Sequence, residues 1–359
     1  MTGPTSVAVV PGDDAAPEAV YASMSVLEEL CESMGLPIEF DMLPPGVELA
    51  DLPEGEREAM VNERCDAADS VLFGSSNGTT PGLQHLRWGR KTYANVRPVR
   101  FRPGFRSPMA HPEGLDYVIV RENLEDSYVG IMGDADALRS SGLIGPRARL
   151  AWEGEGRFAA KIITRAGTEK VARFSFELAR KRAAASGSKA RLTVSAKTNM
   201  LPATDRYFCD IVEEVGADYP DVRLERFIVD DMAHRLVTRF DELDVLLLPN
   251  LYGDVLSDLG AGTLGGMGLA PSGCYGDDSA YFESAHGTAP DLVGQDRINP
   301  TATLLSAAMM LEYLGFAEVA NRLDRAIGEV YARGRTLTVD QGGTATTNEF
   351  AAAVRDLLN

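Results

Sequence analysis

Cysteine is scarce in this chain, and its spacing argues against a structural zinc site and against a disulfide framework. The four cysteines among 359 residues are scattered, with no Cys-x-x-Cys pair and no neighbouring pair of histidines. A structural zinc site needs clustered ligands and a disulfide framework needs paired cysteines, so the sequence predicts neither. Free thiols persist in a reducing compartment, and we therefore expect a cytoplasmic protein.

Long apolar runs and an excess of positive charge are missing as well. No stretch of about 18 apolar residues occurs, and no basic segment followed by an apolar one opens the chain, so we expect neither a membrane span nor a secretion signal. The 53 acidic residues outnumber the 35 basic ones, which gives a formal net charge of -18. This charge repels phosphates and argues against nucleic acids and anionic membranes as partners. An acidic protein that binds a polyanionic small molecule must therefore gather its arginines locally.

Two common nucleotide-binding motifs are absent. No Gly-x-Gly-x-x-Gly follows a predicted strand, and the glycine-rich stretch from 262 to 268 has the wrong spacing and position for it. No Gly-x-x-x-x-Gly-Lys-Ser/Thr loop occurs either. The sequence thus argues against a dinucleotide-binding Rossmann domain and against a P-loop nucleotidase.

What is present is an alternation of short apolar runs with amphipathic stretches, which is typical of an α/β protein. At 359 residues the chain is long enough for two domains. The predicted strands are 6–10, 70–73, 117–120, 191–195 and 245–248, and the predicted helices are 17–34, 169–184 and 301–314. The last helix is apolar nearly all round and should be buried. We further expect residues 130–161 to leave the compact body, with a mobile loop over 133–145.

Two aspartates four residues apart, Asp254 and Asp258, are the strongest single signal. They follow the strand 245–248 and a break at Pro249-Asn250, where a helix should open. Positions i and i+4 share one helix face, so the two carboxylates project the same way and repel unless a cation lies between them. Carboxylate oxygens suit Mg²⁺ or Mn²⁺, and ligands gather at the carboxyl ends of strands in α/β sheets. A solvated helix face is the alternative.

Three arginines stand at the ends of predicted elements in this acidic chain: Arg87, Arg97 and Arg121. A guanidinium pairs bidentately with a carboxylate, so three of them suit a di- or tricarboxylic acid. Each one alone would more often form a surface ion pair. Tyr128 and Lys197 are candidate proton-transfer residues, with a structural role as the alternative for each.

Motifs in order along nearly the whole chain carry a resemblance to a known family. The most specific are Tyr93-Ala94-Asn95-Val96-Arg97-Pro98, the stretch from Asn250 to Asp258, and His286-Gly287-Thr288-Ala289-Pro290-Asp291 followed by Asn299-Pro300-Thr301. The chain resembles the metal-dependent, β-decarboxylating 2-hydroxyacid dehydrogenases. This family includes isopropylmalate, isocitrate, homoisocitrate and tartrate/D-malate dehydrogenases.

The resemblance implies a fold of the isopropylmalate/isocitrate dehydrogenase type, with two α/β domains around a cleft. Residues 1–98 and 262–359 would form the larger, cofactor-binding domain. Residues 99–261 would form the smaller domain, which carries the dimer contacts and the substrate and metal residues. The resemblance also implies a homodimer whose two subunits share each active site.

The resemblance implies roles for the substrate and metal residues. The three arginines would bind the carboxylates of a malate-like acid, and Leu83 would meet its substituent. Asp254 and Asp258 would bind the metal from one subunit. Asp230 of the partner subunit would supply the third ligand, with the neighbouring position 231 as the alternative register.

The same resemblance implies how protons and hydride move. The partner's Lys197 would take the proton of the 2-hydroxyl group, and Tyr128 would protonate the enolate carbon after CO₂ leaves. Mg²⁺ or Mn²⁺ would lower the pKa of the hydroxyl group and stabilise the enolate. A nicotinamide dinucleotide would accept the hydride.

For this cofactor, the resemblance implies an adenosine loop formed by His286, Gly287, Thr288, Ala289 and Asp291. Asn299 would lie on the adenine side, and Glu283 and Asn199 would lie near the nicotinamide. Asp291 stands where NADP-using members carry a basic residue. A carboxylate accepts hydrogen bonds from a ribose 2′-hydroxyl but repels a 2′-phosphate, so NAD is favoured.

The chain departs from the family pattern in two loops. The family's Gly-Asp-Gly-Ile-Gly-Pro-Glu is Gly12-Asp13-Asp14-Ala15-Ala16-Pro17-Glu18 here, so two glycines are lost and a different loop path is expected. In the loop before Arg87, Pro81 and Leu83 replace a Ser and an Asn of isocitrate enzymes, and Thr80 replaces a Glu of isopropylmalate enzymes.

These departures favour a divergent family member that oxidatively decarboxylates a 3-substituted malate. The acid would be isopropylmalate-like or an unusual analogue such as phosphonomethylmalate, with Gln84 and His85 as candidates for contacting an anionic substituent. A tartrate/D-malate dehydrogenase and an isocitrate or homoisocitrate dehydrogenase are the alternatives. A non-catalytic regulatory paralogue is an alternative of a different class.

Overall fold

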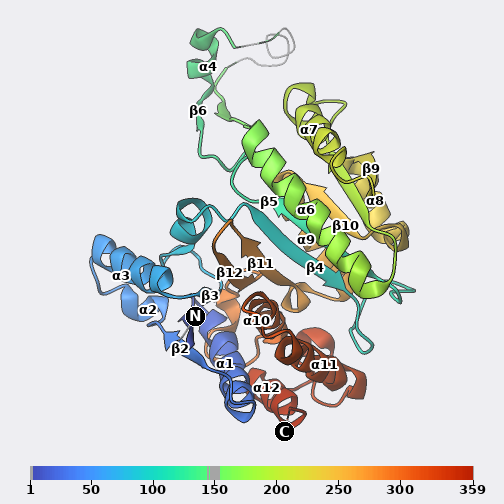
Figure 1. Ribbon diagram of the computed structural model, residues 1–359. Coiled ribbons are helices and arrows are strands. Elements are labelled where there is room, and N and C mark those ends of the chain that lie inside the picture. The colour runs from blue at the N-terminus through green and yellow to red at the C-terminus, as the bar shows by residue number, and fades with distance from the viewer. Residues whose placement is uncertain (1–2, 144, 146–153, 359) are drawn as a thin grey trace.

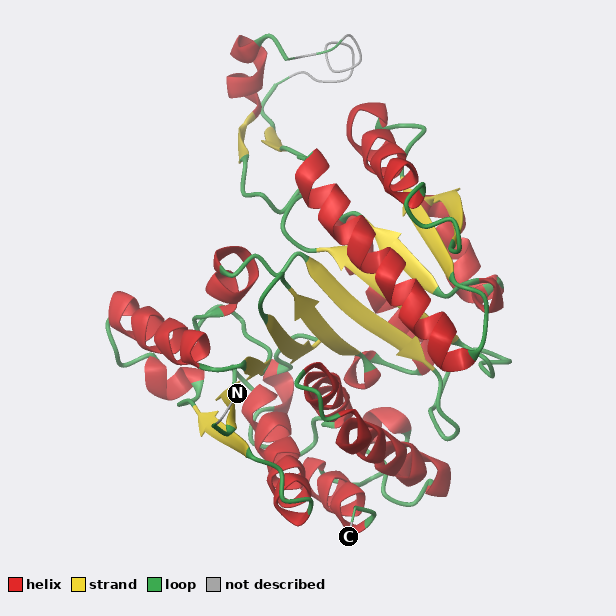
Figure 2. Ribbon diagram, in the orientation of Figure 1, coloured by secondary structure: helices red, strands yellow, loops and turns green. Residues whose placement is uncertain are grey.

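The computed structural model describes residues 3–143, 145 and 154–358. Figure 1 traces the chain from the blue N-terminus to the red C-terminus, and Figure 2 shows helices packed around one long sheet. The α/β class expected from the alternating sequence pattern is confirmed.

The described residues form strands β1 (Thr5–Val10), β2 (Ile38–Met42), β3 (Ser70–Phe73), β4 (Ala94–Arg100), β5 (Asp116–Glu122), β6 (Met132–Asp134), β7 (Arg157–Ala159), β8 (Arg191–Ala196), β9 (Arg223–Ile228), β10 (Val245–Leu248), β11 (Pro271–Tyr275) and β12 (Ala280–Ser284). The helices are α1 (Ala16–Ser33), α2 (Gly46–Leu49), α3 (Glu54–Ala67), α4 (Ala135–Ser141), α6 (Arg165–Ser186), α7 (Tyr207–Gly216), α8 (Val229–Thr238), α9 (Asn250–Leu264), α10 (Thr301–Tyr313), α11 (Ala317–Arg333) and α12 (Thr347–Asp356).

Ten of these strands form one sheet in the order β2-β1-β3-β12-β11-β4-β5-β10-β8-β9. β5, β10 and β8 run parallel, with Leu248 opposite Arg121 and Leu247 opposite Val194. Their carboxyl ends therefore lie at one edge of the sheet. β4 runs antiparallel to β5 and β11. Arg97 of β4 therefore lies next to β5, opposite Ile119.

Strand β10 shows how the sequence pattern builds the layers. Successive side chains of a strand point to opposite faces. Val245 and Leu247 pack with the apolar face of α6 and α7, whereas Leu246 and Leu248 pack with residues of α8 and α9. A strand covered on both faces is expected to be apolar throughout, and all four residues of β10 are buried. The predicted buried helix is α10, which is covered nearly all round.

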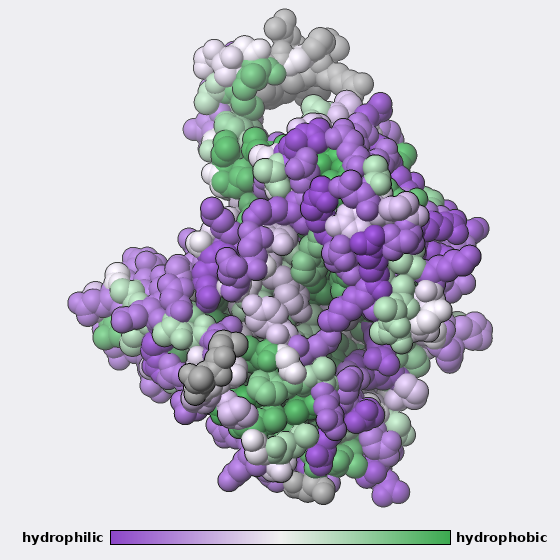
Figure 3. All heavy atoms as spheres, in the orientation of Figure 1, coloured by the Kyte–Doolittle hydropathy of each residue, from purple (hydrophilic) through white to green (hydrophobic). Residues whose placement is uncertain are grey.

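The segment after β5 leaves the body as predicted, but its inner part is not the loop expected over 133–145. β6 pairs with β7, and α4 follows β6 directly. Figure 1 shows β6 and α4 standing away from the main body, and Figure 3 shows hydrophobic surface along this projection. The pairing is held by Asp134 with Arg157 at 2.9 Å and by Phe158 against Gly133. These contacts join residues far apart in sequence, which a local pattern does not reveal. Residues 144 and 146–153 of the predicted excursion lie outside the described residues.

The predicted division into domains stays a prediction. The boundary at residue 98 falls inside β4, and the boundary between 261 and 262 falls inside α9. The large sheet crosses the first boundary without interruption. None of the described helices is long and apolar enough to cross a lipid bilayer.

Candidate active site

Asp254 and Asp258 lie on the first turns of α9, directly beyond the buried strand β10. Both carboxylates reach the surface, with 35% and 56% of their side chains exposed. Burial raises the pKa of Asp258, and the neighbouring Arg97 guanidinium acts against this rise. The pair is therefore a partly exposed acidic site beside buried positive charge.

Two of the predicted arginines supply that charge. The Arg97 guanidinium lies 3.4 Å from Asp254 Oδ1 and 3.6 Å from Asp258 Oδ1, and Arg121 forms an ion pair with Asp254. Only 9% and 4% of the two arginine side chains are exposed. Burial and the neighbouring guanidiniums of Arg97 and Arg87 lower the pKa of Arg121 to about 10. Crowded like charges of this kind favour the binding of an anion.

The third arginine joins this group through an asparagine. Arg87 lies on a π-helical turn, His85–Gly89, a form that often occurs at functional sites. It donates to the Asn123 carbonyl at 2.6 Å and to Asn250 Oδ1 at 3.1 Å. Arg121 donates to the same Asn250 oxygen at 2.9 Å. Asn250 thus sets the spacing of two arginines, a role that the sequence prediction missed although the residue opens the predicted helix.

Tyr128 lies beside the same cluster. Its hydroxyl donates to Asp254 Oδ2 at 2.9 Å, and its ring faces the Arg121 guanidinium at 5.5 Å. Burial and the Asp254 carboxylate raise the pKa of Tyr128 above its ordinary value. The phenol therefore keeps its proton at neutral pH, as a proton donor must.

Lys197 and Asp230 form a second, separate group. Lys197 follows β8, Asp230 opens α8, and the two side chains are ion-paired. The adjacent Asp231 is engaged by Arg235 at 2.7 Å. Which of the two aspartates would reach a metal stays a prediction. Among the described residues, neither Lys197 nor Asp230 forms a hydrogen bond or ion pair with Asp254 or Asp258.

The predicted adenosine loop borders a cavity of about 560 Å³. His286, Gly287, Ala289 and Asn299 line it, together with apolar residues such as Met267 and Ile298. Burial lowers the pKa of His286, and its Nε2 has no hydrogen-bond partner among the described residues. A neutral ring with a free nitrogen beside an apolar cavity suits a purine base.

Other residues predicted for this loop are placed differently. Thr288 is buried and donates to Asp14, and Asp291 is exposed and does not line the cavity. The Asn299 side chain is 4% exposed and is engaged by Asp340 at 2.9 Å and by the Thr301 amide at 3.0 Å. Its side-chain oxygen thus accepts the first backbone N–H of α10.

The remaining predicted residues surround these groups. Glu283 lies on β12, where burial raises its pKa and the guanidiniums of Arg97, Arg87 and Arg121 act in the opposite direction. Leu83 is half-buried against an apolar cluster. Asn199 is exposed beyond β8.

The altered N-terminal loop takes a strained turn. Asp14 has φ of +53°, a left-handed conformation that favours glycine. Its carboxylate accepts from Asn77 Nδ2 at 3.0 Å and from the Thr288 hydroxyl. These bonds connect the loop before Arg87 with the adenosine loop and offset the backbone strain.

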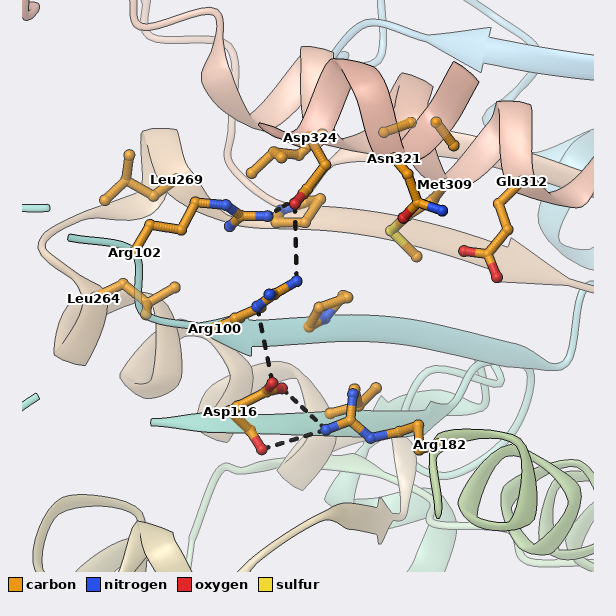
Figure 4. A pocket seen from close by; sticks show the side chains of 16 residues that line it. Arg100, Arg102, Asp116, Arg182, Leu264, Leu269, Met309, Glu312, Asn321 and Asp324 are labelled. Carbon is orange, nitrogen blue, oxygen red and sulfur yellow. Dashed lines mark hydrogen bonds and ion pairs between the residues drawn. The ribbon is translucent and has the colours of Figure 1, made fainter. Parts of the chain in front are cut away.

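A second cavity, of about 250 Å³, lies apart from these residues (Figure 4). Figure 4 shows Arg100 between Asp116 and Asp324, each 3.8 Å from its guanidinium. Arg182 reaches Asp116 from α6 at 2.9 Å. None of the predicted site residues lines this cavity. Its charges are paired with one another across β4, β5 and two helices.

Known proteins match this chain over almost its whole length. A family model described as isocitrate/isopropylmalate dehydrogenase matches residues 6–354. The chain is 39% identical over 355 residues to a 3-isopropylmalate/3-methylmalate dehydrogenase from Methanocaldococcus jannaschii, covering 97% of each chain. It is 38% identical over 364 residues to an isocitrate/homoisocitrate dehydrogenase from Thermus thermophilus, covering 98% of each. The crystal structure of isocitrate dehydrogenase from Methylococcus capsulatus matches with a TM-score of 0.82 at 29% identity, covering 99% of both chains.

Proposed function

Because this chain belongs to the isocitrate/isopropylmalate dehydrogenase family, we propose that it oxidatively decarboxylates a 3-substituted malate with NAD and a divalent metal. The family and the fold type expected from the sequence motifs are both confirmed. Membership establishes the general reaction, which is that of a decarboxylating hydroxyacid dehydrogenase. The choice of acid, cofactor and metal is the proposal.

The observation that carries the proposal is the clustering of three arginines beside one carboxylate pair. Arg87, Arg97 and Arg121 come from three separate segments, yet shared partners hold them together. Guanidiniums bind carboxylates bidentately, so this cluster suits an acid with two or more carboxylates. Asp254 pairs with Arg121 and accepts a hydrogen bond from Tyr128. A metal bound to Asp254 would therefore lie next to both the acid-binding arginines and Tyr128.

The donor set of the site fits a hard divalent cation. Asp254 and Asp258 present carboxylate oxygens, which suit Mg²⁺ or Mn²⁺. Among the described residues of one chain, no group of three His, Cys, Asp or Glu side chains lies close enough to hold a metal ion. We propose Asp230 of the partner subunit as a further protein ligand, as the resemblance to the family implies.

A homodimer with shared sites is part of the proposal. Lys197 and Asp230 stand in a group of their own, away from the arginine cluster. Helices α8 and α9 pack together and leave Val237 and Val255 exposed, at 39% and 61%. Exposed apolar side chains beside an acidic site support a subunit contact there.

Within such a site, we assign each side chain the role that the family resemblance implies. The arginines bind and orient the carboxylates of the acid. The partner's Lys197 accepts the proton of the 2-hydroxyl group, and Tyr128 returns a proton to the carbon that loses CO₂. When bound, the divalent metal polarises the 2-oxygen and stabilises developing negative charge.

NAD is the proposed hydride acceptor. His286 and Ala289 border the cavity for the adenosine part, while Glu283 lies within the influence of the arginine cluster. Asp291 is exposed on the loop, where its carboxylate would accept from a ribose 2′-hydroxyl and repel a 2′-phosphate. The cytoplasm is the proposed location, because all four cysteines are free thiols.

The loop before Arg87 narrows the choice of substituent. Thr80 is 2% exposed and both its amide and hydroxyl bind Asp13, so it anchors the loop. His85 is engaged by Asp66 at 2.8 Å, which removes it as a free contact for an anionic substituent. Leu83 and Gln84 are left as the residues that meet the 3-substituent. A leucine there favours isopropylmalate or a similar acid over isocitrate.

Tartrate/D-malate and isocitrate or homoisocitrate activities remain the alternatives, and the name of the Thermus relative supports the latter two acids. A non-catalytic paralogue is disfavoured because Tyr128, Lys197 and both aspartates are retained. The test is a screen of 3-isopropylmalate, 3-methylmalate, phosphonomethylmalate, isocitrate, homoisocitrate, D-malate and tartrate, with NAD or NADP and Mg²⁺ or Mn²⁺.

The expected result is metal-dependent production of NADH and CO₂ from 3-isopropylmalate, 3-methylmalate or phosphonomethylmalate. Preference for isocitrate, or for NADP, would contradict the corresponding part of the proposal. A protein that oxidises none of these acids would contradict it altogether.

A further inference from the structure

Two fully buried carboxylates lie near the candidate site without any assigned role. Asp126 follows β5, Asp205 follows β8, and both are 0% exposed. Burying an ionised carboxylate is costly unless a cation and hydrogen bonds compensate it. The cation is Lys161, whose ammonium lies 3.4 Å from Asp126 Oδ1 and 2.9 Å from Asp205 Oδ2. Ser127 also donates to Asp126 Oδ1, through its amide at 2.7 Å and its hydroxyl at 3.1 Å.

The second oxygen of each carboxylate points to a different part of the candidate machinery. Asp205 Oδ1 accepts the backbone N–H of Lys197 at 2.9 Å. Asp126 Oδ2 accepts the backbone N–H of Leu251 at 3.1 Å, one residue after Asn250. Each carboxylate therefore faces Lys161 with one oxygen and accepts a backbone N–H with the other. The N–H comes from the residue after β8 for Asp205 and from the first turn of α9 for Asp126. The Lys161 ammonium, with Asp205 on one side and Asp126 on the other, therefore connects the backbone of Lys197 to the backbone of Leu251.

Other contacts hold Lys161 in this position. Its side chain is only 14% exposed, and its ammonium lies 4.4 Å from the centre of the Tyr252 ring on α9. The next residue, Ile162, exchanges two backbone hydrogen bonds with Asp126, at 2.8 and 3.2 Å. Thr204 donates to Asp205 Oδ2 at 2.9 Å. The lysine is thus fixed by α9, by β5's following loop and by the turn after β8.

We propose that Lys161 is a positioning residue, which fixes the Lys197 loop relative to the start of α9. This inference rests on the proposed function, because it assigns catalytic meaning to Lys197 and to the Asn250-centred arginine cluster. In the proposed dimer, Lys197 serves the partner's site while Asn250 serves its own. The Asp126–Lys161–Asp205 network therefore joins the residues that one subunit gives to two different active sites.

The experiment compares purified dimers that carry Lys161→Met, Lys161→Arg, or Lys161→Met together with Asp205→Asn. The double variant removes one negative charge with the positive one, so it folds even if the single methionine variant does not. Asn keeps an oxygen for the Lys197 amide. Lys181→Met is the matched control, because Lys181 lies on the surface of α6 and forms an exposed ion pair with Glu312 of α10.

The expected result has two parts. In the Lys161→Met and double variants, kcat falls roughly 10- to 100-fold, because small displacements of reacting groups have large effects on rate. KM for the cofactor stays within about threefold, since no network residue contacts the adenosine loop. Lys161→Arg keeps the charge and restores kcat to within about threefold of wild type. The control variant behaves as wild type.

Amide hydrogen exchange gives a readout that does not depend on turnover. The amides of Lys197 and Leu251 should exchange at least about tenfold faster in both methionine variants than in the wild type. If wild type oxidises no acid, the proposed function fails while this exchange still tests the connection. Unchanged kcat and exchange in a folded methionine variant would overturn the inference. Full recovery of kcat in the double variant, or failure of both variants to fold, would reduce Lys161 to a compensating charge and overturn it equally.

Discussion

Arg87, Arg97 and Arg121 bring three positive charges together in a chain whose formal net charge is -18. Two of them are nearly fully buried, so their mutual repulsion is not screened by water. Burial and the guanidiniums of Arg97 and Arg87 lower the pKa of Arg121, and the Asp254 carboxylate acts against this lowering. The residual positive charge is what an anionic substrate would neutralise.

Replacing Tyr128 with phenylalanine tests its role as proton donor. The change removes the hydroxyl that donates to Asp254 but keeps the ring beside Arg121. We expect kcat to fall roughly 100-fold or more with little change in KM, because a general acid acts in the transition state. Steady-state kinetics with the best acid from the screen measures this. Tyr21→Phe is the control, since Tyr21 is similarly exposed and lies on α1. An active Tyr128→Phe enzyme would assign the proton to another donor.

Glu122 should make the stability of the protein depend on pH. It is 1% exposed, and burial raises its pKa from 4.5 to about 7, with the Leu124 and Glu125 amides acting against the rise. A carboxyl with a raised folded-state pKa contributes stability below its unfolded pKa, and this contribution is lost as pH rises through the folded value. Stability attributable to Glu122 is thus present below pH 4.5 and lost by about pH 7.

The matching measurement is urea unfolding at pH 5 and pH 8. Between these values, wild type should lose on the order of 2 kcal/mol more unfolding free energy than Glu122→Gln, which carries no charge at either pH. Glu113→Gln, at an exposed position, should follow the wild-type profile. Equal pH profiles for wild type and Glu122→Gln would show that Glu122 does not titrate in this range.

At the scale of single elements, helix α9 must lie very close to β5 to bring Asp254 to Arg121. Glycine at 253 makes this possible, because a Cβ there would lie 2.6 Å from the Cβ of Arg121. The same helix contains Gly262, where an added Cβ would meet nothing within 4 Å. Helix α9 therefore contains one glycine at which an added methyl group would clash, Gly253, and one at which it would not, Gly262.

Gly253→Ala should push α9 away from β5. We expect kcat/KM to fall roughly tenfold or more, because Asp254 and Arg121 separate. The unfolding free energy should fall by about 1–3 kcal/mol, as in other overpacked sites. Gly262→Ala should leave activity unchanged and leave stability equal or higher by up to about 1 kcal/mol. Kinetics and urea unfolding of both variants decide this, and a fully active Gly253→Ala enzyme would contradict the close-packing argument.

The N-terminal loop shows how a residue other than glycine can hold a left-handed conformation. The sequence predicts a path different from the family's, and this stays a prediction. Asp14 itself adopts the left-handed conformation that glycine tolerates best. Hydrogen bonds to Asn77 and Thr288 stabilise it there. A pattern of residue types predicts strain at such a position, but only the surrounding structure shows what offsets it.

At the scale of the whole molecule, the shared active site makes a prediction about mixed dimers. Homodimers of Lys197→Met and of Asp254→Asn should each be inactive. A heterodimer of the two has one site that combines an intact Asp254 with the partner's intact Lys197. An equal mixture that assembles at random should therefore recover about a quarter of wild-type activity.

Co-expression of the two variants, followed by kinetic assay and sizing of the purified dimer, makes the measurement. The Asp254→Asn chain mixed with Asp258→Asn is the control, since both changes fall in the same half-site and no intact site forms. No recovery in the first mixture would place Lys197 and Asp254 in one subunit's site, contrary to the proposal.

The sequence by itself determined the elements whose pattern is local. The strand at 245–248, the buried helix from 301 and the i, i+4 pair at Asp254 and Asp258 depend on periodicity within a few residues. The family motifs also identified the arginines, Tyr128 and Lys197 before any geometry was known. Charge type and spacing along the chain carry this information directly.

Only the tertiary structure decided which of these groups meet. Asn250 joins Arg87 to Arg121, Asp230 rather than Asp231 meets Lys197, and the β6–β7 pairing replaces an expected loop. The proposed role of Lys161 depends on two buried carboxylates beside it, Asp126 and Asp205, which are 79 residues apart in sequence. Burial and long-range contact set the electrostatic energy of each charge, and a linear pattern contains neither.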